Sequence, residues 1–174
     1  MSDNSRALRK GFNLAEKIIA GHLIANLVSI CGNVLHKVAK NREFTGWSGN
    51  TQRSYMGGVY YKGRLVQIVN QENWTHPALR KKLKKGQWGY LKNPYEGVPR
   101  SVYGAVDTDG KYGEDTSKIF LHQYKGCPKK GFAMVITTGT EYSEYIEGNG
   151  LDVLTNTFLE ASEILANGFK PLPE

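Results

Sequence analysis

The stretch Ser54-Tyr-Met-Gly-Gly-Val-Tyr-Tyr61, followed by Lys62-Gly63 and Arg64-Leu-Val-Gln-Ile-Val69, decides the fold of this chain. Both runs are rich in aromatic and β-branched residues, which favour strands. The Lys62-Gly63 pair supplies the positive φ that a tight hairpin turn requires. Residues 51–70 are therefore predicted to form a β-hairpin, which would begin a sheet.

A long helix is predicted before the hairpin, over residues 5–40. Its apolar residues recur at steps of three and four, which is the spacing of one helical face, and neighbouring apolar positions widen that face. Gly21 costs about 1 kcal/mol relative to alanine inside a helix, so a break into two shorter helices at Ala20-Gly21-His22 stays open. The stripe comprises Leu8, Phe12, Ala15, Ile19, Leu23, Leu27, Ile30, Val34 and Val38.

Residues 71–100 are the least regular part of the chain and are predicted to be an insertion between strands. Aromatic residues alternate with lysines between positions 74 and 95. Such a loop can offer stacking platforms beside phosphate contacts, or it can fold its aromatics onto the core or into a partner subunit. Five positive charges in six residues make its basic run the possible DNA-facing site: Arg80, Lys81, Lys82, Lys84 and Lys85.

Further strands are predicted over residues 101–146. Ser101–Val106 is rich in residues that favour strands, and Ser117–Tyr124 and Phe132–Ile136 alternate well enough to pair through the turn at 125–131. Asp107, Asp109, Glu114 and Asp115 do not continue to the glutamate at the twelfth position of an EF-hand loop, so no calcium site is predicted.

The segment Glu141–Gly150 is interpreted as a strand that leads into a final helix at 151–167. In a strand, Tyr142 and Tyr145 would point to opposite faces, one to the core and one to a partner. Gly148 and Gly150 would let the chain turn, and Glu147 would serve a contact between subunits. The final helix is amphipathic and is ended by Asn167-Gly168.

Length and composition indicate one globular domain of 174 residues, 40% of them hydrophobic. No apolar run is long enough to predict a membrane span, and the polar N-terminus is unlike a secretory signal. The two cysteines, Cys31 and Cys127, lack metal-type spacing and are predicted to be plain thiols. Net charge is +7, which favours phosphate backbones or an acidic protein as partners.

Motifs for catalysis are not found, and neither a cofactor nor a metal is predicted. The chain has no phosphate-binding glycine loop, no nucleophile elbow and no paired-histidine motif. A thiol–imidazole pair of Cys127 and His122 would need chance proximity. An enzyme built on Glu144, Glu147 and His122 is the remote alternative, and a nucleic-acid-binding module that uses the 74–95 loop is the nearer one.

Three short motifs resemble the tail-completion (head-to-tail connector, neck) proteins of tailed bacteriophages. The run Ser48–Tyr55 is similar to the Thr-Gly-x-Leu-Arg-x-Ser motif that follows the N-terminal helix in that family. Residues Tyr142–Gly148 look like its Tyr-Ala-x-Tyr-Val-Glu-x-Gly motif, and Thr157–Ala161 look like its Pro-Phe-Leu-x-Pro-Ala ending. The three occur in the family's order and cover about a fifth of the chain.

This resemblance implies an α+β protomer with a long N-terminal helix, a curved antiparallel sheet of about four to six strands and a C-terminal amphipathic helix. It implies a non-catalytic virion protein, assembled in the host cytoplasm, that forms a six- or twelve-fold ring around the DNA channel. Expected neighbours are the portal or head-completion adaptor and tail proteins, with non-specific DNA contact and no membrane. The expected subunit interface comprises Arg53, Tyr55, Tyr142, Tyr145, Glu147 and Phe158.

Overall fold

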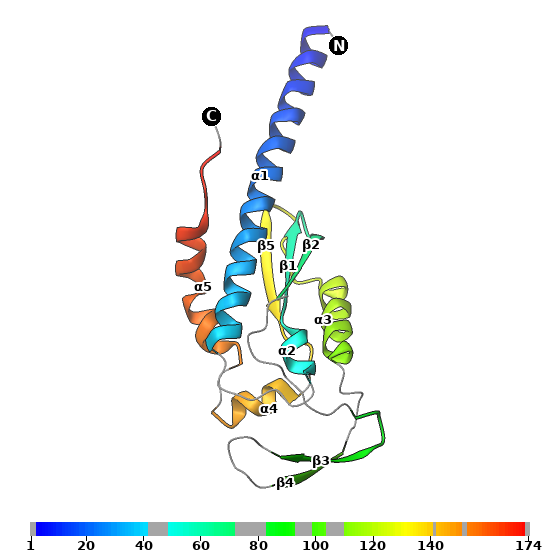
Figure 1. Cartoon of the computed structure of the whole chain (residues 1–174). Coiled ribbons are helices and arrows are strands. Elements are labelled where there is room, and N and C mark those ends of the chain that lie inside the picture. Colours follow the sequence, from blue (N-terminus) through cyan, green and yellow to red (C-terminus); the bar gives the residue numbers. More distant parts are fainter. Residues whose placement is uncertain are drawn as a thin grey trace.

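The computed structural model of the chain describes residues 3–41, 49–71, 83–92, 99–103, 110–140, 142–150 and 153–172. The fold is α+β, with a long N-terminal helix, antiparallel strands and a C-terminal helix, which confirms the predicted class (Figure 1). The elements in chain order are α1 (Asp3–Asn41), α2 (Asn50–Ser54), β1 (Met56–Tyr61), β2 (Arg64–Asn70), β3 (Trp88–Lys92), β4 (Pro99–Tyr103), α3 (Lys111–Gln123), β5 (Phe132–Thr137), α4 (Tyr142–Gly148) and α5 (Thr155–Gly168).

The main sheet has the strand order β2-β1-β5, and all of its pairs are antiparallel. The predicted hairpin is confirmed: Tyr61 faces Arg64, and both Lys62 (φ 51°) and Gly63 (φ 74°) take the left-handed conformation. The register between β1 and β2 shifts at Val59/Tyr60. β3 and β4 form a separate two-stranded sheet, so the five described strands are divided between two sheets and do not form the single sheet predicted.

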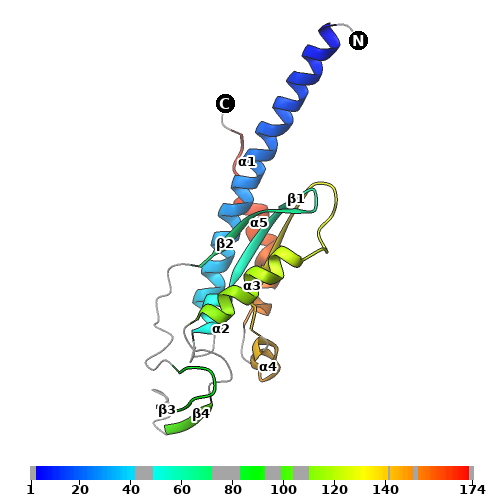
Figure 2. The same ribbon diagram turned by 90° about the vertical axis from the view of Figure 1, so that its right-hand side faces the viewer.

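Strand β1 is buried because it has a strand on each side and a helix over each face (Figure 2). Its side chains alternate between the two faces. Val59 belongs to the core cluster under α1, while the Tyr60 hydroxyl donates a hydrogen bond to the Leu121 carbonyl on α3, at 2.6 Å. Gly57 allows close packing, because a Cβ there would lie 2.0 Å from Cys31 Sγ.

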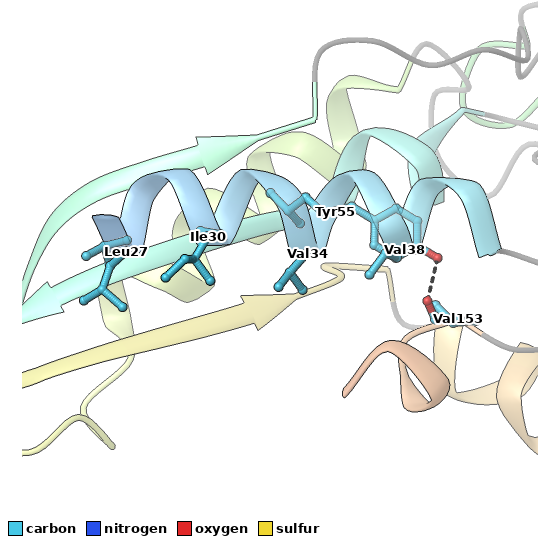
Figure 3. Packing of buried hydrophobic residues seen from close by; sticks show 9 residues of the cluster. Leu27, Ile30, Val34, Val38, Tyr55 and Val153 are labelled. Atoms are coloured by element: carbon cyan, nitrogen blue, oxygen red, sulfur yellow. Dashed lines mark hydrogen bonds between the residues drawn. The ribbon is translucent and has the colours of Figure 1, made fainter. Parts of the chain in front are cut away.

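The core lies between α1, the sheet and the segment before α5 (Figure 3). Only the second half of α1 contributes, since residues 4–19 are all exposed. The helix is continuous through Gly21, so the alternative of two shorter helices is wrong. The cluster of buried side chains comprises Leu27, Ile30, Cys31, Val34, Leu35, Val38, Tyr55, Val59 and Val153.

The prediction of a strand at Ser117–Tyr124 is wrong, because Lys111–Gln123 forms helix α3. Its buried positions are Gly113, Ser117 and Leu121, which recur every four residues. Two of these three are not large apolar residues, so the helical stripe is hidden in the sequence. The expected partner of that strand, β5, pairs with β1 instead.

The prediction of a strand at Tyr142–Gly148 is also wrong, since this segment is helix α4. The predicted irregular insertion contains β3 and the start of β4, which pair from Trp88↔Tyr103 to Lys92↔Pro99. The C-terminal helix is confirmed as α5, and Gly150 takes the left-handed conformation expected at a turn before it (φ 81°).

Candidate assembly site

The first two motifs meet through a chain of hydroxyl groups, here named the motif junction, which comprises Thr51, Ser54, Thr138, Thr140 and Ser143. Ser54 Oγ lies 2.6 Å from Thr138 Oγ1, which lies 3.0 Å from Ser143 Oγ. Ser143 Oγ lies 2.5 Å from Thr140 Oγ1, and Thr140 Oγ1 donates to Thr51 Oγ1 at 3.5 Å. The motif junction therefore joins α2 to α4 through the end of β5.

The hydroxyls of the motif junction bond to one another and to backbone carbonyls, as in a structural network. Ser54 Oγ donates to the Thr51 carbonyl at 2.7 Å, and Ser117 Oγ of α3 donates to the Ser54 carbonyl at 2.5 Å. Among the described residues, the hydrogen bonds of these hydroxyls include no imidazole, carboxylate or thiol that could accept a proton from a serine.

Tyr55 is a core residue, so its predicted place at a subunit interface is wrong for its side chain. It is 1% exposed, and its hydroxyl donates to the Val153 carbonyl at 3.2 Å (Figure 3). A buried tyrosine needs such a partner for its hydroxyl. Tyr55 thereby joins the first motif to the segment that begins α5.

Glu147 binds within its own chain, where it caps α5. Its Oε1 accepts hydrogen bonds from the Leu154 N–H at 2.7 Å, the Thr155 N–H at 3.1 Å and the Thr155 hydroxyl at 3.1 Å. Burial alone would raise the pKa of Glu147, but these bonds outweigh it and lower the pKa below its ordinary value. Glu147 therefore satisfies N–H groups at the start of α5 within its own chain, and its predicted contact between subunits stays a prediction.

The other predicted interface residues differ in their surroundings. Arg53 is exposed, and its stem lies so close to Gly110 that a Cβ there would be 2.4 Å from Arg53 Cδ. Phe158 is 76% exposed on α5 and is free to meet a partner. The side chains of Tyr142 and Tyr145 lie outside the described part of the structure, although their backbone is in α4.

The first half of α1 projects beyond the rest of the protein as a single helix (Figures 1 and 2). The predicted apolar stripe is buried from Leu27 onward, but at Leu8, Phe12 and Ile19 it is 64%, 68% and 46% exposed. Leu14 and Ile18 widen the uncovered part. A contiguous exposed apolar face of this kind is typical of a surface that interacts with another protein or with a membrane.

A second uncovered apolar surface lies on α5, on the side away from its buried Thr157. Phe158 and Leu159 are 76% and 70% exposed. The helix carries two acidic residues, Glu160 and Glu163, and no basic ones, whereas residues 3–17 of α1 carry four basic and two acidic residues. Glu160 forms an ion pair with Lys37 of the same chain, so Glu163 carries the negative charge that α5 can offer beside its apolar surface, whereas the α1 surface is net positive.

The predicted DNA-facing run is only partly described. Lys84 and Lys85 are exposed beside the start of β3, while Arg80, Lys81 and Lys82 lie outside the described residues. The structure brings together other basic residues that the sequence interpretation did not group, at the turn between β1 and β2 and the turn before β5. Their proximity depends on the pairing of β1 with β5, which carries no local sequence signal.

In the described part of the chain, histidine, cysteine, aspartate and glutamate side chains do not form a cluster of three or more that could hold a metal ion. Cys31 is fully buried, and burial raises its pKa to about 12, so its thiol is unreactive. A hollow of about 420 Å³ is lined by Leu23, Leu27, Phe132, Ala133, Met134, Leu165 and Phe169, none of which can act as an acid, base or nucleophile.

In comparisons with protein-family models, curated proteins and solved structures, none matches this chain. By length and composition alone, α1 could cross a membrane, since its most apolar window has a mean hydropathy of 1.8. Of that window, 39% is buried inside the protein, and the core helix of a globular protein can be equally long and apolar.

Proposed function

We propose that this protein is a structural subunit of a bacteriophage neck, which assembles as a ring that joins the portal side of the head to the tail and surrounds the DNA channel. The observation that carries the proposal is the uncovered apolar face on residues 4–19 of α1. The resemblance to neck proteins supports it, since the first two motifs are linked through the motif junction, and Tyr55 and Glu147 hold the residues just before the third.

The partner for this face is α5 of a second copy. The exposed part of α1 spans 16 residues, about 24 Å, and α5 has 14 residues, about 21 Å, so the two helices match in length. The exposed Glu163 of α5 is of opposite charge to the net positive residues 3–17 of α1. Because the two surfaces are different, each copy would bind the next head to tail, which closes a ring when the rotation between copies allows it.

Paired variants test this interface. We expect Leu8→Ser/Phe12→Ser on α1, or Phe158→Ser/Leu159→Ser on α5, to reduce the assembled wild type to monomers, as measured by native mass spectrometry. Mixing the two variants restores one intact interface and yields heterodimers but no ring. The matched control is Ile119→Ser/Phe120→Ser on α3, which removes similarly exposed apolar side chains and leaves the ring intact.

Three other outcomes would each contradict a different part of the proposal: the α5 partner, the protein nature of the partner, or the neck function. If the α5 variant still assembled while the α1 variant did not, the α1 faces would pair with each other. Flotation of the wild type with lipid vesicles, lost in the α1 variant, would assign that face to a membrane. A wild-type protein that stays monomeric and is absent from purified phage particles would remove the neck function altogether.

A further inference from the structure

Two turns that are distant in the sequence form one basic surface, here named the basic tip, which comprises Lys62, Arg64, Lys125, Lys129 and Lys130. The Lys62 N–H donates to the Gly131 carbonyl at 2.9 Å. A Cβ on Gly63 would lie 3.5 Å from the Pro128 carbonyl oxygen, so the two turns are in contact.

Aromatic packing holds the basic tip in place. The rings of Tyr61 and Phe132, at the ends of the paired strands β1 and β5, stack with their centroids 4.7 Å apart. Lys62 Nζ lies 4.9 Å from the centre of the Tyr61 ring. The pairing of β1 with β5 and the stacked rings therefore hold the two turns of the basic tip side by side.

The charges of the basic tip are almost uncompensated. All five side chains belong to exposed residues. Glu16 of α1 forms an ion pair with Lys62 at 2.7 Å. Among the described residues, the ion pairs found do not involve Arg64, Lys125, Lys129 or Lys130, which leaves four cations that can bind an external anion.

The basic tip and the projecting residues 3–17 of α1 together carry a positive excess equal to the net charge of the chain. Residues 3–17, 62–64 and 125–130 contain nine of the 23 basic residues and two of the 16 acidic residues, which accounts for the net charge of +7. The remaining fourteen basic and fourteen acidic residues cancel. The basic tip lies at the end of the sheet from which α1 projects (Figure 1), so a polyanion would be attracted to that end.

We propose that the basic tip binds the phosphate backbone of duplex DNA without reading its sequence. Lysine acts as a point charge toward phosphate, and phosphate contacts carry no base information. The two turns contain no leucine, isoleucine, phenylalanine or tryptophan that could insert into a lipid bilayer. The choice of DNA among nucleic acids rests on the proposed function, in which the ring surrounds DNA.

The strength of the salt dependence follows from the number of free cations. Four phosphate contacts give a slope of log affinity against log salt of about −3.6, which is roughly a 150-fold loss of affinity between 50 and 200 mM salt. A protein that used only one or two of these cations would give a slope shallower than about −2.

The experiment compares the affinity for a mixed-sequence DNA duplex of two variants with equal net charge. The tip variant is Arg64→Gln/Lys125→Gln/Lys129→Gln/Lys130→Gln. The matched control is Lys40→Gln/Lys84→Gln/Lys85→Gln/Lys111→Gln, which changes exposed lysines away from the basic tip and includes two residues of the predicted 80–85 run. Fluorescence anisotropy is measured between 50 and 200 mM salt.

We expect the tip variant to bind more than about 100-fold more weakly at 50 mM salt, with a slope flatter by three to four, while the control keeps the wild-type slope within about one. Equal losses in both variants would show that only net charge matters and would overturn the site. A loss confined to the control would place DNA at the 80–85 run. Tighter binding to anionic lipid vesicles than to DNA would also refute the proposal.

Native mass spectrometry of the same samples separates this inference from the proposed function. A tip variant that assembles normally but loses DNA leaves the ring intact and supports the site. If the wild type assembles but does not bind DNA, only the proposal that the basic tip binds DNA is overturned. If the wild type binds DNA through the basic tip but stays monomeric, only the proposal that the protein forms a ring is overturned.

Discussion

Removing the carboxylate of Glu147 should destabilise the protein and not merely weaken contacts between subunits. One oxygen of Glu147 accepts hydrogen bonds from two N–H groups and a hydroxyl at the start of α5, at 2.7, 3.1 and 3.1 Å. In Glu147→Ala these donors lose their partner at the helix terminus. Because α5 packs on α1 through the core cluster, fraying of its first turn weakens the whole domain.

The expected loss is set by capping and by solvent access. Loss of an N-terminal cap costs about 0.5–2 kcal/mol, and hydrogen bonds to a charged group contribute about 1.5–3 kcal/mol. Because Glu147 is half-buried, solvent screens part of this interaction. We therefore expect Glu147→Ala to lower the free energy of unfolding by about 1.5 kcal/mol, and Glu147→Gln, which keeps one acceptor oxygen, by about half as much.

Urea unfolding at pH 7, followed by circular dichroism at matched oligomeric state, measures the effect. Glu144→Ala on the same helix is the control, because Glu144 is exposed. If Glu147→Ala and Glu144→Ala agree within about 0.5 kcal/mol, the usual range for surface changes, the cap is unimportant. If Glu147→Ala kept the wild-type stability but lost the ring, the prediction that Glu147 contacts a neighbouring subunit would be supported instead.

The pH dependence gives an independent check on Glu147. Its pKa is lowered on folding from an ordinary value of 4.5, so the folded protein binds this proton less tightly than the unfolded chain does. The stabilisation is fully present above pH 4.5 and is lost as the pH falls through the lower folded pKa. The difference in unfolding free energy between wild type and Glu147→Ala should therefore be constant from pH 7 to 5.5 and shrink below 4.5.

Three further changes test the packing. Gly57→Ala should cost about 3 kcal/mol, because the new methyl group would lie 2.0 Å from Cys31 Sγ, and Cys31→Ala in the same chain should reduce that cost in urea unfolding. Tyr55→Phe leaves the buried Val153 carbonyl without its donor and should cost about 1 kcal/mol by the same measurement. Asn26→Ala removes bonds of 3.1 and 3.2 Å to the C-terminal tail and should speed proteolysis of that tail roughly tenfold.

The sequence predicted the elements whose signals are local. The hairpin follows from Lys62-Gly63 between two β-rich runs, and α1 and α5 follow from long apolar periodicity. Helix α3 escaped prediction because it buries Gly113 and Ser117, whose small size suits close contact with α2: a Cβ on Gly113 would lie 1.9 Å from the Asn50 carbonyl oxygen. Tertiary packing, not hydrophobicity, selects these residues.

The candidate site was less accessible from the sequence, because its contacts join distant segments. Glu147 was singled out, but its role was not, since it lies seven residues before Leu154 and no local capping pattern has that spacing. Tyr55 ends the Ser48–Tyr55 run that the sequence analysis singled out, yet its partner Val153 is 98 residues away. The basic tip likewise needs the antiparallel pairing of β1 with β5.

The division of α1 into a covered and an uncovered half has a consequence for synthesis. Of the elements that cover its second half, β1 follows soon after α1 but α5 is made late, and about 114 residues separate the end of α1 from the start of α5. At roughly 5–20 residues per second, a ribosome takes about 6–23 s to make that interval. Throughout it, the part of the apolar face that α5 covers stays open together with the uncovered first half of α1, so neighbouring nascent chains on one messenger can meet through α1 before any of them has completed its fold.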